Sequence, residues 1–226
     1  MKHLVVLTGA GISAESGIKT FRDADGLWEG HDVMEVATPQ GFAKNPELVL
    51  NFYNQRRKQL LSVKPNEAHI ALAALESTYK VTIITQNVDD LHERAGSSNI
   101  IHLHGELLKA RSSKNEQDIK TWKTDIQLGD LCQQGHQMRP HIVWFGEAVP
   151  MIEKAIDICE TADTLVIIGT SMQVYPAASL MDFVPSQTPI YYIDPKPARV
   201  RNQKITVIPK SATEGVKNLL DFLKNP

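Results

Sequence analysis

The sequence predicts an α/β protein built on a doubly wound parallel sheet, with a small inserted domain. Two observations carry this prediction. Short runs rich in Val, Ile and Leu recur along the 226 residues, and helical patterns lie between them. Several of these runs are continuously apolar rather than alternating, which is typical of parallel strands buried on both faces of a sheet.

The apolar runs and the capping residues place the elements in order. Helices are expected over residues 46–61, after Asn66, over residues 151–159, and after a capping box formed by Ser211 and Glu214. Strands are expected at residues 4–7, 81–85, 100–103, 141–145, 164–168, 190–193 and 205–208.

Two polar stretches interrupt this alternation. Residues 23–38 are expected to form a long loop anchored by Trp28, and residues 109–140 a small excursion from the main sheet. We therefore expect a single domain over residues 1–226, in two parts. The main part comprises residues 1–22, 62–108 and 141–226, and the small part comprises residues 23–61 and 109–140.

Composition excludes several classes of protein. The net charge of −2 gives no electrostatic reason to expect a nucleic-acid partner. No apolar run reaches transmembrane length, and the first residues form a strand pattern rather than a signal peptide. Cys132 and Cys159 are the only cysteines, which excludes a disulfide framework. We expect a cytoplasmic protein without nucleic-acid or membrane partners.

The first strand passes directly into a glycine-rich turn. Gly9, Gly11 and Ala14 have the spacing of a dinucleotide-binding turn, in which glycines allow a tight bend and close approach to a pyrophosphate. A glycine-rich turn in another α/β protein is the alternative. The usual acidic residue about 20 positions later has no second strand to carry it here. The turn therefore predicts a Rossmann-like unit that does not hold its cofactor as a hydride-transferring dehydrogenase does.

Polar side chains follow two later strands. Gln86, Asn87 and Asp89 come after the strand at residues 81–85, where ligands bind in open α/β sheets, although Asn87 or Asp89 can also simply cap a helix. Alternation along the next strand puts His102 and His104 on one face. A histidine beside glycine can act as a general base near neutral pH. A structural histidine and a paired-histidine metal site are the alternatives.

Five motifs in order resemble those of the sirtuins, which are NAD-dependent protein-lysine deacylases. The resemblance covers nearly the whole chain. The motifs are GAGISAESGIKTFR at residues 9–22, TQNVD at 85–89, HG at 104–105, VWFGE at 143–147 and GTS at 169–171.

The resemblance implies a role for each matching residue. His104 is implied to be the catalytic base. Asn87 and Asp89 are implied to hold the nicotinamide carboxamide, and Gln86 a ribose hydroxyl. The other implied NAD contacts, in the turn, beside the nicotinamide ribose and on the adenosine side, are Gly9, Ala10, Gly11, Ser13, Glu15, Phe21, Arg22, Gly169, Thr170, Ser171, Asp194 and Ala212.

The resemblance also implies a protein substrate. Val143, Phe145, Gly146 and Glu147 belong to a segment that is implied to pair as a strand with the substrate backbone. The implied reaction transfers the acyl group to NAD and yields free lysine, nicotinamide and 2′-O-acyl-ADP-ribose.

A helical pair of side chains indicates which acyl group is removed. Tyr53 and Arg56 are three residues apart and share a helix face, where a guanidinium can bind a carboxylate with two hydrogen bonds. An exposed arginine is the alternative, because Arg57 and Lys58 follow. The pair resembles the Tyr-x-x-Arg motif of sirtuins that remove succinyl, malonyl and glutaryl groups. Ala37 resembles the small residue that widens their acyl pocket.

The chain departs from the family pattern at two places. The family's small domain usually holds zinc on two Cys-x-x-Cys pairs, but residues 111–115 contain no cysteine, and the second region offers only Cys132, with His136 and His141 nearby. Structural zinc normally has four ligands, so we expect no zinc and a small domain packed around Trp122 and Leu131. Asp194 stands where asparagine is common in the family, and its carboxylate can still accept from ribose hydroxyls.

The expected function is therefore NAD-dependent removal of acidic acyl groups from protein lysines by a monomer, with weaker activity on acetyl groups. Two rival functions remain on the same scaffold. One is an NAD hydrolase or ADP-ribosyltransferase, which needs neither a base such as His104 nor the segment at residues 143–147. The other is a non-catalytic module that binds acyl-lysine, which needs no intact cofactor motifs.

Overall fold

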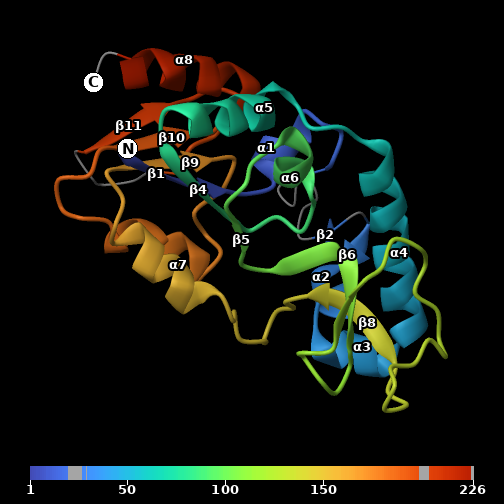
Figure 1. The fold of residues 1–226 in the computed structure, drawn as a ribbon. Coiled ribbons are helices and arrows are strands. Elements are labelled where there is room, and N and C mark those ends of the chain that lie inside the picture. The colour runs from blue at the N-terminus through green and yellow to red at the C-terminus, as the bar shows by residue number, and fades with distance from the viewer. Residues whose placement is uncertain (20–26, 29, 199–203, 225–226) are drawn as a thin grey trace.

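The computed structural model describes residues 1–19, 27–28, 30–198 and 204–224 and contains a six-stranded parallel sheet (Figure 1). Its order is β11-β10-β9-β1-β4-β5, so the direction of winding reverses between β1 and β9. Open α/β sheets bind ligands at the carboxyl ends of the strands beside such a reversal. The predicted doubly wound, Rossmann-like fold is confirmed. The strands are β1 (His3–Thr8), β4 (Lys80–Thr85), β5 (Ile100–His102), β9 (Thr164–Ile168), β10 (Ile190–Ile193) and β11 (Ile205–Ile208).

Helices cover both faces of this sheet. Leu4 and Val6 pack toward one face, under α1 (Gly11–Ala14), α5 (Glu67–Ala74) and α8 (Ala212–Lys224). Val5 and Leu7 pack toward the other, against α7 (Ile152–Cys159) and the 3₁₀ helix η3 (Ala177–Phe183). Figure 1 shows α5 and α8 on one side of the strands and α7 on the other. Burial on both faces explains why these strands are continuously apolar.

The predicted helices are present, with one difference in capping. Asn66 caps α5 as expected, because its side-chain oxygen accepts the Ala68 N–H at 3.0 Å; η2 (Leu75–Ser77) follows. At α8, however, the Ser211 hydroxyl donates to Glu15 Oε1 at 3.1 Å, and the Thr213 N–H donates to Glu15 Oε2 at 2.9 Å. A carboxylate from the end of α1 thus stabilises the start of α8 and joins the two helices. None of the helices described is both long and apolar enough to cross a membrane.

A three-stranded antiparallel sheet of order β7-β6-β8 lies in the small part and extends at both ends beyond the expected bounds of residues 109–140. It spans residues 105–142 and consists of β6 (Gly105–Ser112), β7 (Ile119–Thr121) and β8 (Met138–Ile142). The strand expected at residues 141–145 is therefore the end of β8, outside the parallel sheet, and β6 and β7 were not expected. Most residues of β6 and β8 are buried, and β7 is exposed, but charged and polar residues are mixed with apolar ones along all three strands. Their pattern therefore lacks the continuous apolar runs of the main sheet.

Helices and a short hairpin complete the small part. They are β2 (Leu27–Trp28), β3 (His31–Asp32), α2 (Val33–Val36), α3 (Pro39–Lys44) and α4 (Pro46–Ser62). Much of the loop expected at residues 23–38 is thus regular structure. Trp122 packs against a cluster that includes Leu50 and Met138, as expected, but Leu131 is 57% exposed. The expected packing of Leu131 is therefore wrong, and the buried Ile126 belongs to this cluster instead.

Candidate active site

A cavity of about 580 Å³ lies between the carboxyl ends of the main strands and the small part. Phe21 and Arg22 lie outside the described residues. Ala212 is buried in the core, while the neighbouring Ser211 lines the cavity. The predicted site residues that line it are Gly9, Ala10, Gly11, Ser13, Glu15, Ala37, Tyr53, Arg56, Gln86, Asn87, Asp89, His104, Val143, Phe145, Gly146, Glu147, Gly169, Thr170, Ser171 and Asp194.

The glycine turn after β1 touches the end of β9 backbone to backbone. The Gly11 N–H donates to the Gly169 carbonyl at 2.8 Å. A Cβ atom on Gly9 would lie 2.8 Å from the Gly169 oxygen, and one on Gly11 would lie 2.6 Å from the Gly169 Cα atom. Gly169 itself has a φ of 64°, which disfavours other residues. The three glycines thus let the ends of two neighbouring strands close one wall of the cavity.

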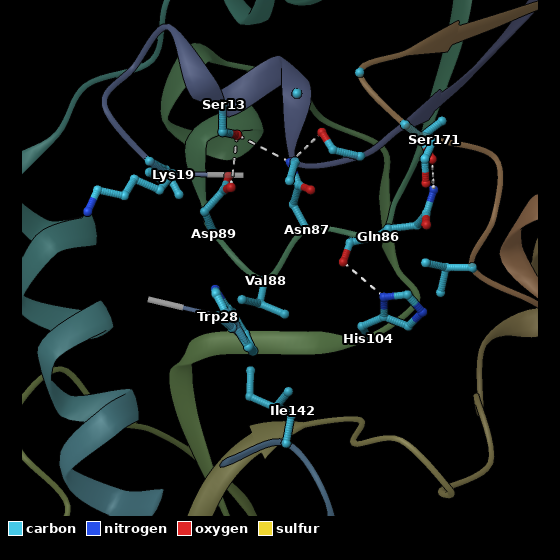
Figure 2. Close-up of a pocket in the computed structure, with 18 of the residues that line it drawn as sticks. Ser13, Lys19, Trp28, Gln86, Asn87, Val88, Asp89, His104, Ile142 and Ser171 are labelled. Carbon is cyan, nitrogen blue, oxygen red and sulfur yellow. Dashed lines mark hydrogen bonds between the residues drawn. The ribbon is translucent and has the colours of Figure 1, made fainter. Parts of the chain in front are cut away.

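Asn87 and Asp89 converge on Ser13 beside this turn, as Figure 2 shows. The Ser13 hydroxyl donates to Asp89 Oδ2 at 2.9 Å, and Asn87 Nδ2 lies 3.2 Å from Ser13 Oγ and 3.1 Å from the Gly9 carbonyl. Burial raises the pKa of Asp89 to about 6, although hydrogen bonds from the Leu91 N–H and Ser13 lower it. Asp89 also precedes α6 (Leu91–Ala95), so it serves both the helix start and the cavity.

The geometry of His104 suits a general base. Its Nδ1 lies 3.0 Å from the Gln86 carbonyl, as the dashed line in Figure 2 marks. A carbonyl only accepts, so Nδ1 carries the proton and Nε2 keeps a lone pair. Burial lowers the pKa of His104, against the opposite effect of its bond to Gln86. The imidazole is therefore neutral at pH 7 and able to take a proton at Nε2.

The neighbouring His102 has a different environment. The strand β5 ends at His102, whose Nε2 lies 2.7 Å from Glu93 Oε1 and whose Nδ1 lies 3.1 Å from the Asn87 carbonyl. Burial opposes its charge, but the hydrogen bond and charge of Glu93 outweigh burial and raise the pKa of His102. His102 therefore supports the loop that carries Asn87, and only His104 of the two lines the cavity.

The described residues of the small part do not gather the donors of a four-ligand zinc site in one place. Among the described residues, the one cluster of three side chains able to hold a metal is Glu93, His102 and Glu106, where Glu106 is already bonded to Lys109 at 2.6 Å. Cys132 instead meets the Ser112 hydroxyl, and that hydrogen bond lowers the pKa of its thiol. One thiol and a hydroxyl do not fit the four-ligand zinc site of the family.

The opposite wall of the cavity is built from α4 and aromatic side chains. The Tyr53 hydroxyl accepts a hydrogen bond from Trp144 Nε1 at 3.0 Å, and burial raises the pKa of Tyr53, so the phenol stays neutral. Arg56 Nη1 donates to the Phe52 carbonyl at 2.7 Å, and its guanidinium carbon lies 3.9 Å from the centre of the Phe52 ring. Trp28 packs edge-on against Phe52 at 5.0 Å. Trp144 belongs to the motif at residues 143–147, but the sequence did not predict that its indole bonds to Tyr53 in this wall.

Residues 9–176 match the model of the Sir2 family. The chain belongs to the Sir2 family. An NAD-dependent protein deacylase of Helicobacter pylori (strain ATCC 700392 / 26695) is 61% identical over 224 residues, which cover 99% of this chain and 98% of that protein. A protein of the same description from Bacteroides thetaiotaomicron is 56% identical over 230 residues, covering 99% of this chain and 98% of that one.

A solved structure agrees with this assignment. The crystal structure of a Sir2 homologue in complex with NAD has a TM-score of 0.88 and 41% identity, and the match covers 99% of this chain and 90% of that chain. The Sir2 resemblance predicted from the five motifs is therefore confirmed. Residues at the deep end of this chain's cavity also fit NAD chemically. They combine a close backbone turn for phosphates with amide and carboxylate groups for a carboxamide and ribose hydroxyls.

Proposed function

We propose that this Sir2 protein is an NAD-dependent protein-lysine deacylase that prefers acidic acyl groups. One observation carries the proposal: the Ser13–Asn87–Asp89 network and His104 share a single cavity with Tyr53 and Arg56. Family membership and the deacylase relatives support NAD-dependent deacylation. The acyl preference and the products, nicotinamide and 2′-O-acyl-ADP-ribose, are our inference from the cavity and the motif.

In this proposal, the main part holds NAD and handles one proton. When bound, NAD supplies an electrophilic ribose carbon and a nicotinamide leaving group. Asn87 and Asp89 hold the carboxamide, since their side chains lie together at the cavity wall. Nε2 of His104 would take a proton from a ribose hydroxyl. The hydrogen bond from His104 Nδ1 to the Gln86 carbonyl orients the imidazole for this transfer. The Gly9–Gly11 turn faces the phosphates, and Ser171 and Asp194 the adenosine side.

The wall formed by Tyr53 and Arg56 selects the acyl group. A succinyl or malonyl group ends in a carboxylate, which pairs with the Arg56 guanidinium and the Tyr53 hydroxyl. Hydrogen bonds to charged groups contribute about 1.5–3 kcal/mol. Because Tyr53 accepts from Trp144, its own hydroxyl proton is directed elsewhere and can be given to the substrate. Ala37 leaves room for the longer acyl chain, and an acetyl group gains nothing from the guanidinium.

The segment at residues 143–147 receives the peptide backbone. It is not a strand in the structure, and its Val143 and Phe145 N–H groups already donate to the carbonyls of His104 and Ala37, each at 2.9 Å. In the proposed function, the other backbone N–H and C=O groups of this segment form the hydrogen bonds to the substrate backbone. We also propose that the protein works as a cytoplasmic monomer on acyl-lysine side chains, without nucleic-acid or membrane partners.

Mass spectrometry of the products tests this function. The purified protein is incubated with NAD and a succinyl-lysine peptide, and His104→Ala protein serves as the control. The proposal predicts equal amounts of deacylated peptide, nicotinamide and 2′-O-succinyl-ADP-ribose. ADP-ribose formed without any change in the peptide would identify an NAD hydrolase, and binding of peptide without NAD turnover would identify a non-catalytic module.

A further inference from the structure

The Glu147 carboxylate is held by two buried arginines. Arg139 Nη1 donates to Oε1 at 2.6 Å and its Nη2 to Oε2 at 3.1 Å, while Arg111 Nη2 lies 3.2 and 3.1 Å from the two oxygens. The side chains of Arg111, Arg139 and Glu147 are only 5%, 7% and 16% exposed. Arginine suits such a carboxylate because its planar fork can donate two parallel hydrogen bonds. We call these three residues the Glu147 clamp.

The register of the small sheet explains why the clamp needs all three members. Arg111 on β6 and Arg139 on β8 are directly opposite partners in the antiparallel pair. Like charges placed opposite one another across two strands repel and are destabilising. The Glu147 carboxylate bonds to both guanidinium groups and offsets this repulsion. The two arginines on these strands therefore fix the position of Glu147 and of the chain segment that carries it.

This arrangement shapes the segment that lines the cavity. The Trp144 N–H donates to Glu147 Oε2 at 2.8 Å, and the Glu147 N–H donates back to the Trp144 carbonyl at 3.0 Å. The carboxylate thus closes a turn over residues 144–147, in which Gly146 has a φ of 88°. Phe145 and Gly146 on this turn, and Val143 just before it, line the cavity.

The clamp also reaches the acyl wall. The Arg139 guanidinium carbon lies 3.3 Å from the centre of the Trp144 ring, and Trp144 Nε1 donates to the Tyr53 hydroxyl at 3.0 Å. An arginine against an indole face is a favourable cation–π contact. Arg139 therefore fixes the indole, and the indole fixes the phenol that faces the substrate. Among the described residues, no side-chain hydrogen bond joins the clamp to the glycine turn or to the His104 side chain.

We propose that Arg111 and Arg139 are positioning residues for the acylated peptide. Through Glu147 they hold the 143–147 segment and the Trp144 indole in the arrangement that receives the substrate. The peptide role rests on the proposed deacylase function. The proposal also changes the part expected for Glu147, whose carboxylate acts inward on the two arginines rather than on the peptide.

Steady-state kinetics of Arg111→Met protein test this role. We expect KM for a succinyl-lysine peptide to rise about tenfold, because hydrogen bonds between charged groups are lost. The KM for NAD and kcat at saturating peptide should stay within about twofold, since the main part is untouched. Arg111→Lys should recover part of the loss. Lys120→Met, which removes an exposed cation from the same sheet, should change nothing.

Hydrogen exchange supplies a readout that does not depend on turnover. Amides of residues 143–147 should exchange at least about tenfold faster in the Arg111→Met protein, because local opening of the turn becomes easier. Amides of β9 and α5 should be unchanged. If Arg111→Met fails to fold, Glu147→Gln supplies the same two measurements. The proposal is overturned if exchange at 143–147 is unchanged, or if KM for NAD rises as much as KM for peptide. An inactive wild-type protein with the predicted exchange would instead count against the proposed function alone.

Discussion

The two walls of the cavity hold their functional side chains in different ways. On the main sheet, each group follows directly from a strand end, with Gly9 after β1, Asn87 after β4 and Gly169 after β9. The backbone of the sheet fixes these positions. On the opposite wall, built from the small part and the adjoining residues 143–147, side chains hold one another, as Trp144 holds Tyr53 and Arg139 holds Glu147. Under the proposed function, the sheet edge supplies the chemistry, while side-chain packing on the opposite wall selects the substrate.

This difference predicts two kinds of mutant. Changes at the sheet edge should remove turnover for every substrate, because the proton transfer and the cofactor contacts are common to all of them. Changes in the small part should alter the ranking of substrates and leave NAD binding intact. A sheet-edge mutation that changed only the ranking of substrates, or a small-part mutation that abolished NAD binding, would contradict this difference.

The largest effect is expected for His104→Ala. Removing a general base lowers rates by about 10²- to 10⁴-fold, so kcat/KM should fall by that factor on succinyl- and acetyl-lysine alike. NAD should still bind, as measured by calorimetry, because the proposed NAD contacts include many groups besides His104. His136→Ala, at an exposed histidine of the small part, is the matched control and should be fully active. Near-normal deacylation by His104→Ala would contradict the assignment of the base.

The next largest effect is expected for Arg56→Met, on one substrate only. The lost interaction of about 1.5–3 kcal/mol corresponds to a fall of about 10- to 100-fold in kcat/KM for succinyl-lysine. Acetyl-lysine has no carboxylate, so its turnover should change little. Tyr53→Phe should show a smaller loss with the same selectivity, because it removes one hydrogen bond from a neutral donor to the carboxylate and leaves the Arg56 guanidinium in place. Lys58→Met, at a 68% exposed side chain of the same helix, is the control. Equal losses on both substrates would show that Arg56 supports the fold instead.

A smaller and more gradual loss of kcat/KM is expected as the pH is lowered. The pKa of Asp89 is raised to about 6 and that of His104 is lowered from its ordinary value of 6.5. In the proposed function both act in their unprotonated forms, so we expect full activity at pH 7 to 8 and its loss as the pH falls through about 6. A profile of kcat/KM against pH should show this acid limb, with a slope of at least about tenfold per pH unit. A limb centred above pH 7 would contradict the neutral His104.

No effect at all is expected from removing metal. The purified protein should contain no stoichiometric zinc by elemental analysis, and a chelator should leave its melting temperature unchanged. The small part is held by the Trp122 cluster and by the Glu147 clamp, which need no ion. About one zinc per chain, together with unfolding by chelator, would show that this part depends on metal as zinc-binding relatives do.

The same contrast explains what the sequence could and could not predict. Each main strand and the residues just after it form one short, continuous motif in the sequence. The main strands and the polar or glycine residues at their ends were therefore predictable. The clamp joins residues as far apart as Arg111 and Glu147, and it depends on the register of β6 and β8, which places Arg111 opposite Arg139. Glu15 at the start of α8 is a similar case, because it accepts hydrogen bonds from Ser211 and Thr213, which lie 196 and 198 residues away in the sequence. The exposed Leu131 shows that an apolar residue type alone does not define a core.

The acyl preference of the wild-type protein decides whether the wall formed by Tyr53 and Arg56 selects the substrate. One peptide, carrying either succinyl- or acetyl-lysine at the same position, is assayed with saturating NAD. If the small part selects acidic acyl groups through Arg56, kcat/KM should be at least about tenfold higher for the succinyl peptide. A protein that deacylates the acetyl peptide more efficiently would contradict the claim and leave only the deacylase function standing.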